Sequence, residues 1–371
     1  MIENNFILFL SEKDKSTRIR MILCLFILLC FGCSSQRESA GQGTELTFRK
    51  EKAIRVSETG LFQRKTVIPL ETADSSLIGA NPSLQKEGEH FFVYSNNGHV
   101  LHFNTKGDFL NKIGNIGIGP GEYPSITDVF VCAANKSVEI LSNRMIQCYS
   151  YDGRFKESLK IDIPAFSFAR SENRYWFYTG NNKAYSPYRL FQTDDKFSVV
   201  REYLNNDSRM LPMMEPVFRN GAYLTFWESL YSDVYRITND DLELSCSIQF
   251  PGLEIPPDAH KMQPMEVIDY LKRFHFATIR CYMENQKYVY LMIVENRGEN
   301  IPVIYQWIIN KQGGHETIIQ TDLLPGSYLL CPQLLTEDNI LYYIGHPIEN
   351  EGENVNLELN PSVVMIDISD M

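Results

Sequence analysis

Short apolar stretches that alternate with polar positions recur along almost the whole chain after residue 60. Gly, Asn, Asp and Pro separate these stretches, and continuous helical periodicity is rare. Alternation with a period of two places every second side chain on one face, as in a half-buried strand. The clearest examples are HVLHFN, SVEILS, YWFYTG, DVYRIT, KYVYLMIV and ILYYIG. The pattern therefore predicts an all-β domain.

A unit of strand, tight turn and strand repeats about every 45 residues. HFNTKGDFLNKI and CYSYDGRFKESL share an aromatic residue, a glycine and a phenylalanine at the same offsets, and their glycines, Gly107 and Gly153, are 46 positions apart. Both units are typical of hairpins with Lys-Gly or Asp-Gly turns. Weaker copies turn near Asp195, Asp240 and Gly313.

This period, with several short strands per unit, predicts a β-propeller. Five outer hairpins and a C-terminal unit, ILYYIG to PSVVMIDI, give six blades of four antiparallel strands. One long interval contains PMEVIDYLKRF, which predicts a short helical insert near residues 257–275. We expect the strand RKTVIPLE, Arg64 to Glu71, to join the C-terminal unit and close the ring, because closure removes open sheet edges.

The segment IGNIGIGPGEY is rich in glycine but fits no phosphate-binding loop. Its glycines do not follow G-x-G-x-x-G, and no Gly-Lys-Ser/Thr closes it. It follows one predicted hairpin and precedes the next inner strand, so it is interpreted as the crossing between two blades. Glu122 either fixes this turn or accepts hydrogen bonds from a ligand, and Tyr123 either packs or offers a ligand platform.

The first 33 residues have the features of an export signal. Lys13, Lys15, Arg18 and Arg20 precede the apolar run Met21–Gly32, which is too short to span a membrane. Cys33 follows directly, and this arrangement resembles a bacterial lipoprotein signal in which the cysteine carries the lipid. Cys30 stands where the usual motif has leucine, and an ordinary cleaved signal with a free Cys33 is the alternative.

We therefore expect a signal peptide over residues 1–33, a flexible tether over 34–60 and a single propeller domain over 61–371. The tether is rich in Ser, Gln, Gly, Glu and Arg. This organisation predicts an outer-membrane lipoprotein of the cell envelope. Its body either faces the periplasm or is exposed at the cell surface.

Charge and cysteine content narrow the classes of partner. The net charge is −11, and removal of the four basic and three acidic groups of residues 1–33 makes it −12. An acidic body without a basic cluster argues against a nucleic-acid partner. The remaining cysteines are odd in number and show no C-x-x-C spacing, which favours buried thiols over a disulfide framework. They are Cys132, Cys148, Cys246, Cys281 and Cys331.

KGDFLNKIGNIGIGPGEYPSITDVFV resembles the signature of the six-bladed, NHL-like β-propeller lipoproteins of Bacteroidetes. SDVYRI, IQFPGLEIP and the ending NPSVVMIDI resemble further segments of that family, so the resemblance covers about residues 65–370. Pro251 followed by Gly252 departs from the usual glycine after the mid-chain phenylalanine. The resemblance implies a propeller fold and export, and it implies no activity.

No catalytic motif has the required spacing, and the candidate ligand-binding residues are isolated. His99 and His102 are expected on opposite faces of a strand. Arg144 either binds an anionic or sugar ligand in the central channel or is a solvated surface charge. Trp227 either stacks on a sugar or lies in the hydrophobic core. His346 either lines a ligand-binding loop or has a structural role. Asp128 and Asp233 are the acids that we place near inner or middle strands.

We expect an exported binding or scaffold module for a glycan, a peptide or an envelope protein, either as a monomer or as part of a membrane complex. The alternative is a propeller-type hydrolase, lyase or lactonase with its site in the central channel. The residues imply no cofactor and no metal ligands. A calcium or other divalent ion in the channel belongs to the enzymatic alternative, which needs inward acidic or histidine side chains from several blades.

Overall fold

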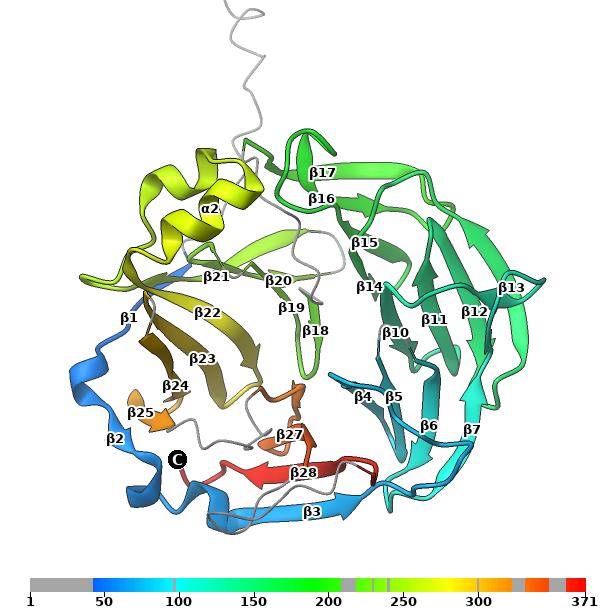
Figure 1. Cartoon of the computed structure of the whole chain (residues 1–371), viewed down its shortest axis with the longest axis horizontal. Helices are drawn as coiled ribbons and strands as arrows, with labels where there is room; N and C mark the ends of the chain where they lie inside the picture. The colour runs from blue at the N-terminus through cyan, green and yellow to red at the C-terminus, as the bar shows by residue number, and fades with distance from the viewer. Residues whose placement is uncertain are drawn as a thin grey trace, which may run out of the picture. The chain divides into compact units, whose positions relative to one another are not determined.

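Six antiparallel sheets stand around a central channel, so residues 65–371 form the six-bladed β-propeller that the sequence predicts (Figure 1). This computed structural model describes residues 43–95, 98–207, 218–228, 230–238, 241–298, 300–321, 331–346 and 358–371. Each blade has four antiparallel strands, given below from the channel to the outer edge, and two blades carry one further parallel strand.

Blades 1 to 3 each use four consecutive strands. Blade 1 consists of β4 (Ser83–Glu87), β5 (His90–Tyr94), β6 (Val100–Asn104) and β7 (Phe109–Ile113). Blade 2 consists of β10 (Asp128–Cys132), β11 (Ser137–Ser142), β12 (Met145–Ser150) and β13 (Phe155–Lys160). Blade 3 consists of β14 (Ser167–Ser171), β15 (Arg174–Tyr178), β16 (Tyr188–Thr193) and β17 (Val199–Asn205).

Blades 4 and 5 continue this order, and blade 6 closes the ring. Blade 4 consists of β18 (Phe218–Asn220), β19 (Leu224–Trp227), β20 (Asp233–Ile237) and β21 (Leu242–Gln249). Blade 5 consists of β22 (His275–Glu284), β23 (Tyr288–Arg297), β24 (Asn300–Asn310) and β25 (His315–Thr321). Blade 6 consists of β26 (Leu334–Leu335), β27 (Ile340–Gly345), β28 (Ser362–Asp367) and the N-terminal β3 (Lys65–Pro69).

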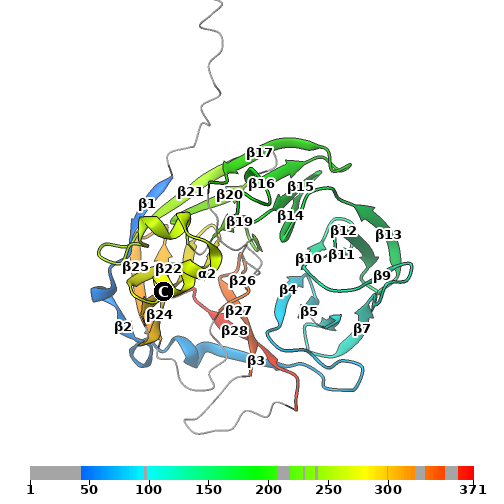
Figure 2. The ribbon, with the colours of Figure 1, turned by 45° about the horizontal axis from the view of Figure 1, so that its top comes forward.

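Ring closure is the antiparallel pairing of β3 with β28, which places Val67 opposite Val364. Figure 2 shows the two strands side by side although they lie at opposite ends of the domain sequence. The predicted closing strand is therefore confirmed.

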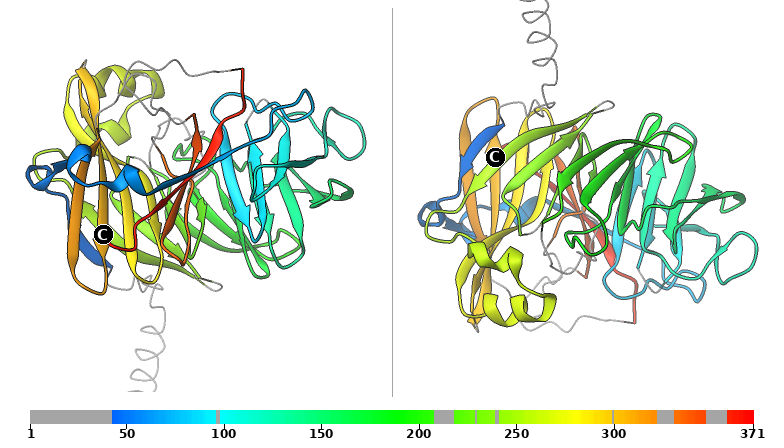
Figure 3. Two further views of the ribbon diagram at one scale, coloured as in Figure 1. Left: turned by 90° about the horizontal axis from the view of Figure 1, so that it is seen from below. Right: turned by 90° about the horizontal axis from the view of Figure 1, so that it is seen from above.

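The segment before β3, residues 44–64, runs along the outer edges of blades 4 and 5, and we call it the N-terminal strap (Figure 3). Its strands pair in parallel with the outermost strands, β1 with β21 and β2 with β25. The prediction of a flexible tether is therefore wrong for residues 44–58. The strap contains β1 (Thr44–Thr47), η1 (Lys50–Lys52), β2 (Ile54–Arg55), η2 (Val56–Glu58) and η3 (Leu61–Arg64).

Side chains of the strap, among them Phe48 and Lys50, hold it against blade 5. Phe48 is buried and meets the Tyr305 ring edge-on at 5.2 Å. Lys50 Nζ donates to Glu295 Oε1 at 2.7 Å. Burial raises the pKa of Glu295, but hydrogen bonds from Arg297, Lys50 and Tyr305 outweigh it and lower that pKa to about 2. Glu295 therefore remains ionised while the strap is bound.

The glycines of the recurring hairpins allow each blade to pack against its neighbour. Gly107 and Gly153 have φ values of +92° and +82°. A Cβ on Gly107 would collide with the Pro69 carbonyl of blade 6, and one on Gly153 would collide with the Lys112 carbonyl of blade 1. The repeated glycine thus provides both a left-handed turn and a close backbone approach.

The helical insert is confirmed as η4 (Pro257–Lys261) and α2 (Pro264–Leu271). Gln263 and Glu266 form a capping box at the start of α2, and Pro264 occupies the first turn. Val267 is buried with Ala259, and Leu271 packs against this pair. Figure 3 shows the insert at one face of the propeller.

The expected buried thiols are also present. Cys132, Cys148, Cys246 and Cys281 are buried free cysteines, and Cys331 is half-buried and free. Burial raises the pKa of the Cys148 and Cys246 thiols to about 12. These thiols therefore behave as small apolar groups.

Among the described residues, no helix is long and apolar enough to cross a membrane.

Gly153→Ala is expected to lower the free energy of unfolding by about 3 kcal/mol, since strain from the left-handed turn and a backbone collision add. The control is Gly314→Ala, because Gly314 has a φ of +64° but nothing lies within 4 Å of its added Cβ. It should cost only about 1 kcal/mol. Urea unfolding measures both, and equal losses would contradict the docking role of Gly153.

Glu295→Gln is expected to lower the melting temperature at neutral pH, with a difference from wild type that shrinks in acid. The folded-state pKa of about 2 lies below the ordinary value of 4.5, so ionised Glu295 stabilises the fold above about pH 4.5. That contribution is lost as the pH falls toward 2. Calorimetry of both proteins from pH 7 to pH 2.5 tests this, and a difference independent of pH would refute it.

Candidate functional site

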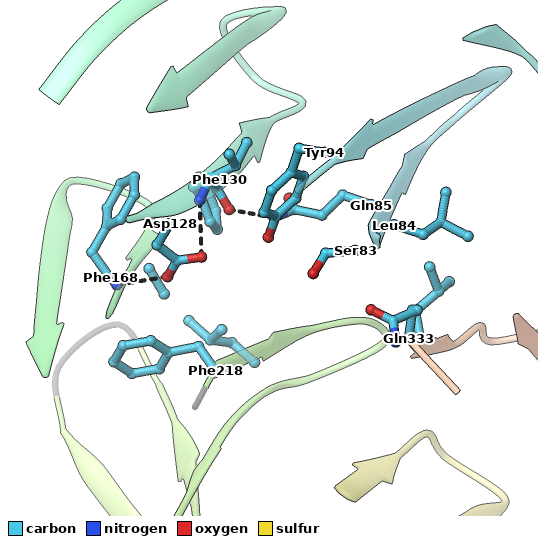
Figure 4. A pocket seen from close by; sticks show the side chains of 13 residues that line it. Ser83, Leu84, Gln85, Tyr94, Asp128, Phe130, Phe168, Phe218 and Gln333 are labelled. Atoms are coloured by element: carbon cyan, nitrogen blue, oxygen red, sulfur yellow. Dashed lines mark hydrogen bonds between the residues drawn. The ribbon is translucent and has the colours of Figure 1, made fainter. Parts of the chain in front are cut away.

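The central channel narrows to a small cavity where five inner strands meet (Figure 4). Its volume is about 40 Å³, which has room for only a few water molecules. Apolar side chains such as Phe130, Phe168 and Phe218 form part of the wall. The polar groups come from Ser83, Gln85, Tyr94, Asp128 and Gln333.

Asp128, an acid that the sequence places near the channel, joins blades 2 and 3. It is buried at the start of β10. Its Oδ1 accepts from the Val129 N–H at 2.8 Å. Its Oδ2 accepts from Ser167 Oγ at 2.5 Å and from the Phe168 N–H at 3.0 Å. Both carboxylate oxygens are therefore engaged by the protein itself (Figure 4).

Gln85 makes the corresponding link between blades 1 and 2. Its Oε1 accepts from the Val131 N–H at 2.9 Å, and its Nε2 donates to the Val129 carbonyl. The amide thus pairs with β10 much as another strand residue would. Gln85 and Asp128 are thus two polar side chains of the channel wall that connect neighbouring inner strands.

In the described part of the chain, no three His, Cys, Asp or Glu side chains converge as a metal site would require. Asp233, the other acid considered, lies in the middle strand β20 and accepts from Ser247 Oγ. His102 pairs with His90, at 2.8 Å between ring nitrogens, and with Asn111 at 3.0 Å. The described residues therefore do not form the metal site that one form of the enzymatic alternative would use.

The glycine-rich segment is the crossing between blades 1 and 2, and two short strands, β8 (Asn115–Ile116) and β9 (Glu122–Tyr123), pair within it. Glu122 Oε2 accepts from the Gly119 N–H at 2.9 Å. Buried Tyr123 donates its hydroxyl to the Ile113 carbonyl at 2.9 Å, and burial raises its pKa to about 12. Both contacts stabilise the crossing.

The other candidate ligand-binding residues lie on separate blades. Arg144 is exposed in the turn between β11 and β12, with a φ of +61°. Trp227 is buried in β19 of blade 4. His346 follows β27 of blade 6, is half-buried, and has a pKa lowered by that burial. Their ligand-binding roles stay predictions, and Cys33 lies outside the described residues.

Sequence analysis missed a buried glutamate–arginine pair at each of three consecutive blade interfaces. A glutamate inside an otherwise apolar strand, as in SVEILS or RCYMEN, was the available signal. In each pair the arginine Cζ also lies over a tyrosine ring, Tyr175, Tyr231 or Tyr223, at 5.1, 4.0 and 4.3 Å respectively. The pairs are Glu139–Arg170 (blades 2 and 3), Glu228–Arg189 (blades 3 and 4) and Glu284–Arg236 (blades 4 and 5).

The interface between blades 2 and 3 also holds a cavity of about 340 Å³, here called the blade 2/3 groove. Ser137, Glu139, Cys148 and Tyr175 are buried side chains of its wall, and Arg170 is partly exposed. Exposed Asn135, Lys156, Glu157 and Asp195 line its outer part. Its volume is at the lower end of the range of about 300–1,000 Å³ that is usual for small-molecule sites.

Comparison with known proteins agrees with this architecture. The sequence matches a family described as "Domain of unknown function (DUF4934)" over residues 44–360. No curated protein matches the chain. A solved Bacteroides fragilis protein, assigned as exported, has a TM-score of 0.70 and 14% identity, and the match covers 87% of this chain and 99% of that one. At this identity the likeness shows the fold alone.

Two other solved structures are more distant. BamB from Moraxella catarrhalis has a TM-score of 0.39 and 8% identity, with 83% of this chain and 98% of that chain covered. The WD40 domain of Pan2 from Neurospora crassa has a TM-score of 0.40 and 8% identity, with coverages of 78% and 89%. Neither likeness bears on function.

Asp128→Ala is expected to lower the free energy of unfolding by about 3 kcal/mol, because three donors at the joint of blades 2 and 3 lose their acceptor. Asp162→Ala is the control, since that side chain is 94% exposed, and it should change stability by no more than about 0.5 kcal/mol. Chemical denaturation compares the two. An unchanged stability in Asp128→Ala would show that Asp128 is not a structural joint.

Proposed function

We propose that this chain, which belongs to the DUF4934 family, is an exported, lipid-anchored propeller that acts as a binding or scaffold module in the cell envelope. Its partner is a glycan, a peptide or an envelope protein. The observation that carries the binding role is the blade 2/3 groove, which has the size of a ligand site, whereas the carboxylate of the channel is engaged within the protein.

The sequence supports export and anchoring. A basic segment, a short apolar run and Gly32-Cys33 are followed by a polar stretch, as in lipoprotein signals. We assign Cys33 as the lipidated residue. The outer membrane then holds the protein through this lipid alone, because the acidic body has no basic cluster for anionic lipid.

The N-terminal strap supports a close attachment to the membrane. Ten residues, 34–43, separate Cys33 from β1, and a chain of that length reaches at most roughly 35 Å. The strap pairs with the outer strand of blade 4, so the anchor connects to the rim of the propeller.

Cys33→Ser is expected to move the protein from the membrane fraction to the soluble fraction and to abolish incorporation of labelled palmitate. A lipid chain adds about 0.8 kcal/mol per buried methylene, so its loss removes the membrane affinity. Cys24→Ser is the matched control, because Cys24 lies earlier in the apolar run and outside the lipoprotein motif, and it should leave both properties unchanged. Membrane retention of the Cys33→Ser protein without palmitate would refute the anchor.

A further inference from the structure

The three glutamate–arginine pairs differ in how completely their carboxylates are satisfied. Glu228 accepts from Tyr178 Oη at 2.9 Å on one oxygen and from Arg189 on the other. Glu284 accepts from Arg236 Nε at 3.1 Å on Oε1 and from Lys311 at 3.4 Å on Oε2. In both pairs, each oxygen has a donor from the protein.

Glu139 is the exception. Its Oε1 accepts from Arg170 Nη1 at 2.9 Å, but its buried Oε2 has no hydrogen-bond partner among the described residues. The Arg170 guanidinium and the Tyr175 hydroxyl are neighbouring donors that lower the pKa of Glu139. Burial nevertheless dominates and raises that pKa. A buried carboxylate oxygen without a donor is costly, so a donor from outside the chain would be stabilising.

Glu139 is a wall residue of the blade 2/3 groove. Strand register places Glu139, Cys148 and Glu157 in one row across β11, β12 and β13. This row forms part of the groove wall and faces Arg170 and Tyr175 of blade 3. Glu139 therefore lies at the buried part of the groove, whereas Glu157 lies at its exposed part.

Ionisable groups of the groove favour a cation. Its carboxylates are Glu139, Glu157 and Asp195, and its cations are Lys156 and Arg170. Both cations already have acceptors, because Arg170 donates to Glu139 and Lys156 Nζ donates to the Asn135 carbonyl at 3.2 Å. The groove thus offers an excess of acceptors, which disfavours an anionic ligand.

We propose that the blade 2/3 groove binds a small organic cation whose primary ammonium group donates a hydrogen bond to Glu139. This inference rests on the binding role proposed above and names its ligand chemistry. An ammonium group supplies three donors and a positive charge to the acceptors of the groove. A sugar would lack a stacking surface there, because Tyr175 is 3% exposed and its ring lies beneath Arg170.

The test is calorimetric titration of the full chain in detergent with putrescine, and with 1,4-butanediol as a ligand of equal length without charge. Putrescine should bind saturably with a dissociation constant of about 1 mM or tighter, and the diol should not bind. Nα-acetyl-lysine amide is the second ligand tested. Tighter binding of this compound than of putrescine would indicate a lysine side chain of a peptide as the source of the ammonium group, and tighter binding of putrescine would indicate a free amine.

Glu139→Gln should weaken putrescine binding by at least about tenfold, because a charged hydrogen bond is replaced by a neutral amide. Glu284→Gln is the matched control, since it alters an equivalent pair outside the groove, and it should leave the affinity unchanged. Asp195→Asn changes an exposed groove residue without risk to folding and should weaken binding severalfold. Melting curves establish that each variant is folded.

Absence of saturable putrescine binding to the wild type, equal binding of the diol, or unchanged affinity in both Glu139→Gln and Asp195→Asn would overturn the inference. The proposed binding function is tested separately, in an experiment that does not depend on putrescine. If glycan arrays and pull-downs with the anchored wild type capture no glycan, peptide or envelope protein, that function is refuted.

Discussion

The joint between neighbouring blades is the interaction on which the propeller depends, because the described strand ladders run within blades and do not cross from one blade to the next. Side chains therefore make most of the contacts between neighbouring blades. Buried ion pairs contribute little net stability, since desolvation of both charges offsets their attraction. Their value is that a displaced blade would leave a buried charge unpaired. Glu139–Arg170, Glu228–Arg189 and Glu284–Arg236 thus fix how blades 2 to 5 dock.

Hydrogen bonds from side chains to the backbone also connect the blades, and closure uses both ends of the domain. Gln85 and Asp128 connect inner strands through backbone amides, so part of each joint resembles a strand ladder made by side chains. Closure through β3 and β28 joins segments separated by almost the whole domain, which makes it a late and entropically costly contact. The N-terminal strap offsets that cost, because its pairing with blades 4 and 5 brings β3 to its place beside β28.

Periodicity predicted the blades well because each hairpin carries its own local signal. Gly107 and Gly153 mark turns whose geometry and close neighbours both demand glycine, so their spacing reveals the repeat. The strap gave no such signal. β1 and β2 are four and two residues long and largely polar, and they become strands only because edges of finished blades accept them. Likewise Glu139 could be recognised as an unusual charge within a strand, but its partner Arg170 lies in another blade. Sequence reasoning named Glu122 and Tyr123 with the correct crossing, yet it could not see the contacts that engage them.

The contrast between Asp128 and Glu139 explains why binding is assigned to a groove between blades and not to the channel. Both are buried acids at the same interface, and burial removes the water molecules that would donate hydrogen bonds to each carboxylate. Val129, Ser167 and Phe168 replace these donors at Asp128, and the cavity beside it has room for only a few water molecules. Arg170 replaces part of them at Glu139, which lines a larger cavity. A ligand gains most where a buried polar group still lacks a partner and where there is room to supply one. In this propeller those two conditions are met at Glu139, so the polar groups that the blade joints leave without a full set of partners are the basis of the proposed recognition site.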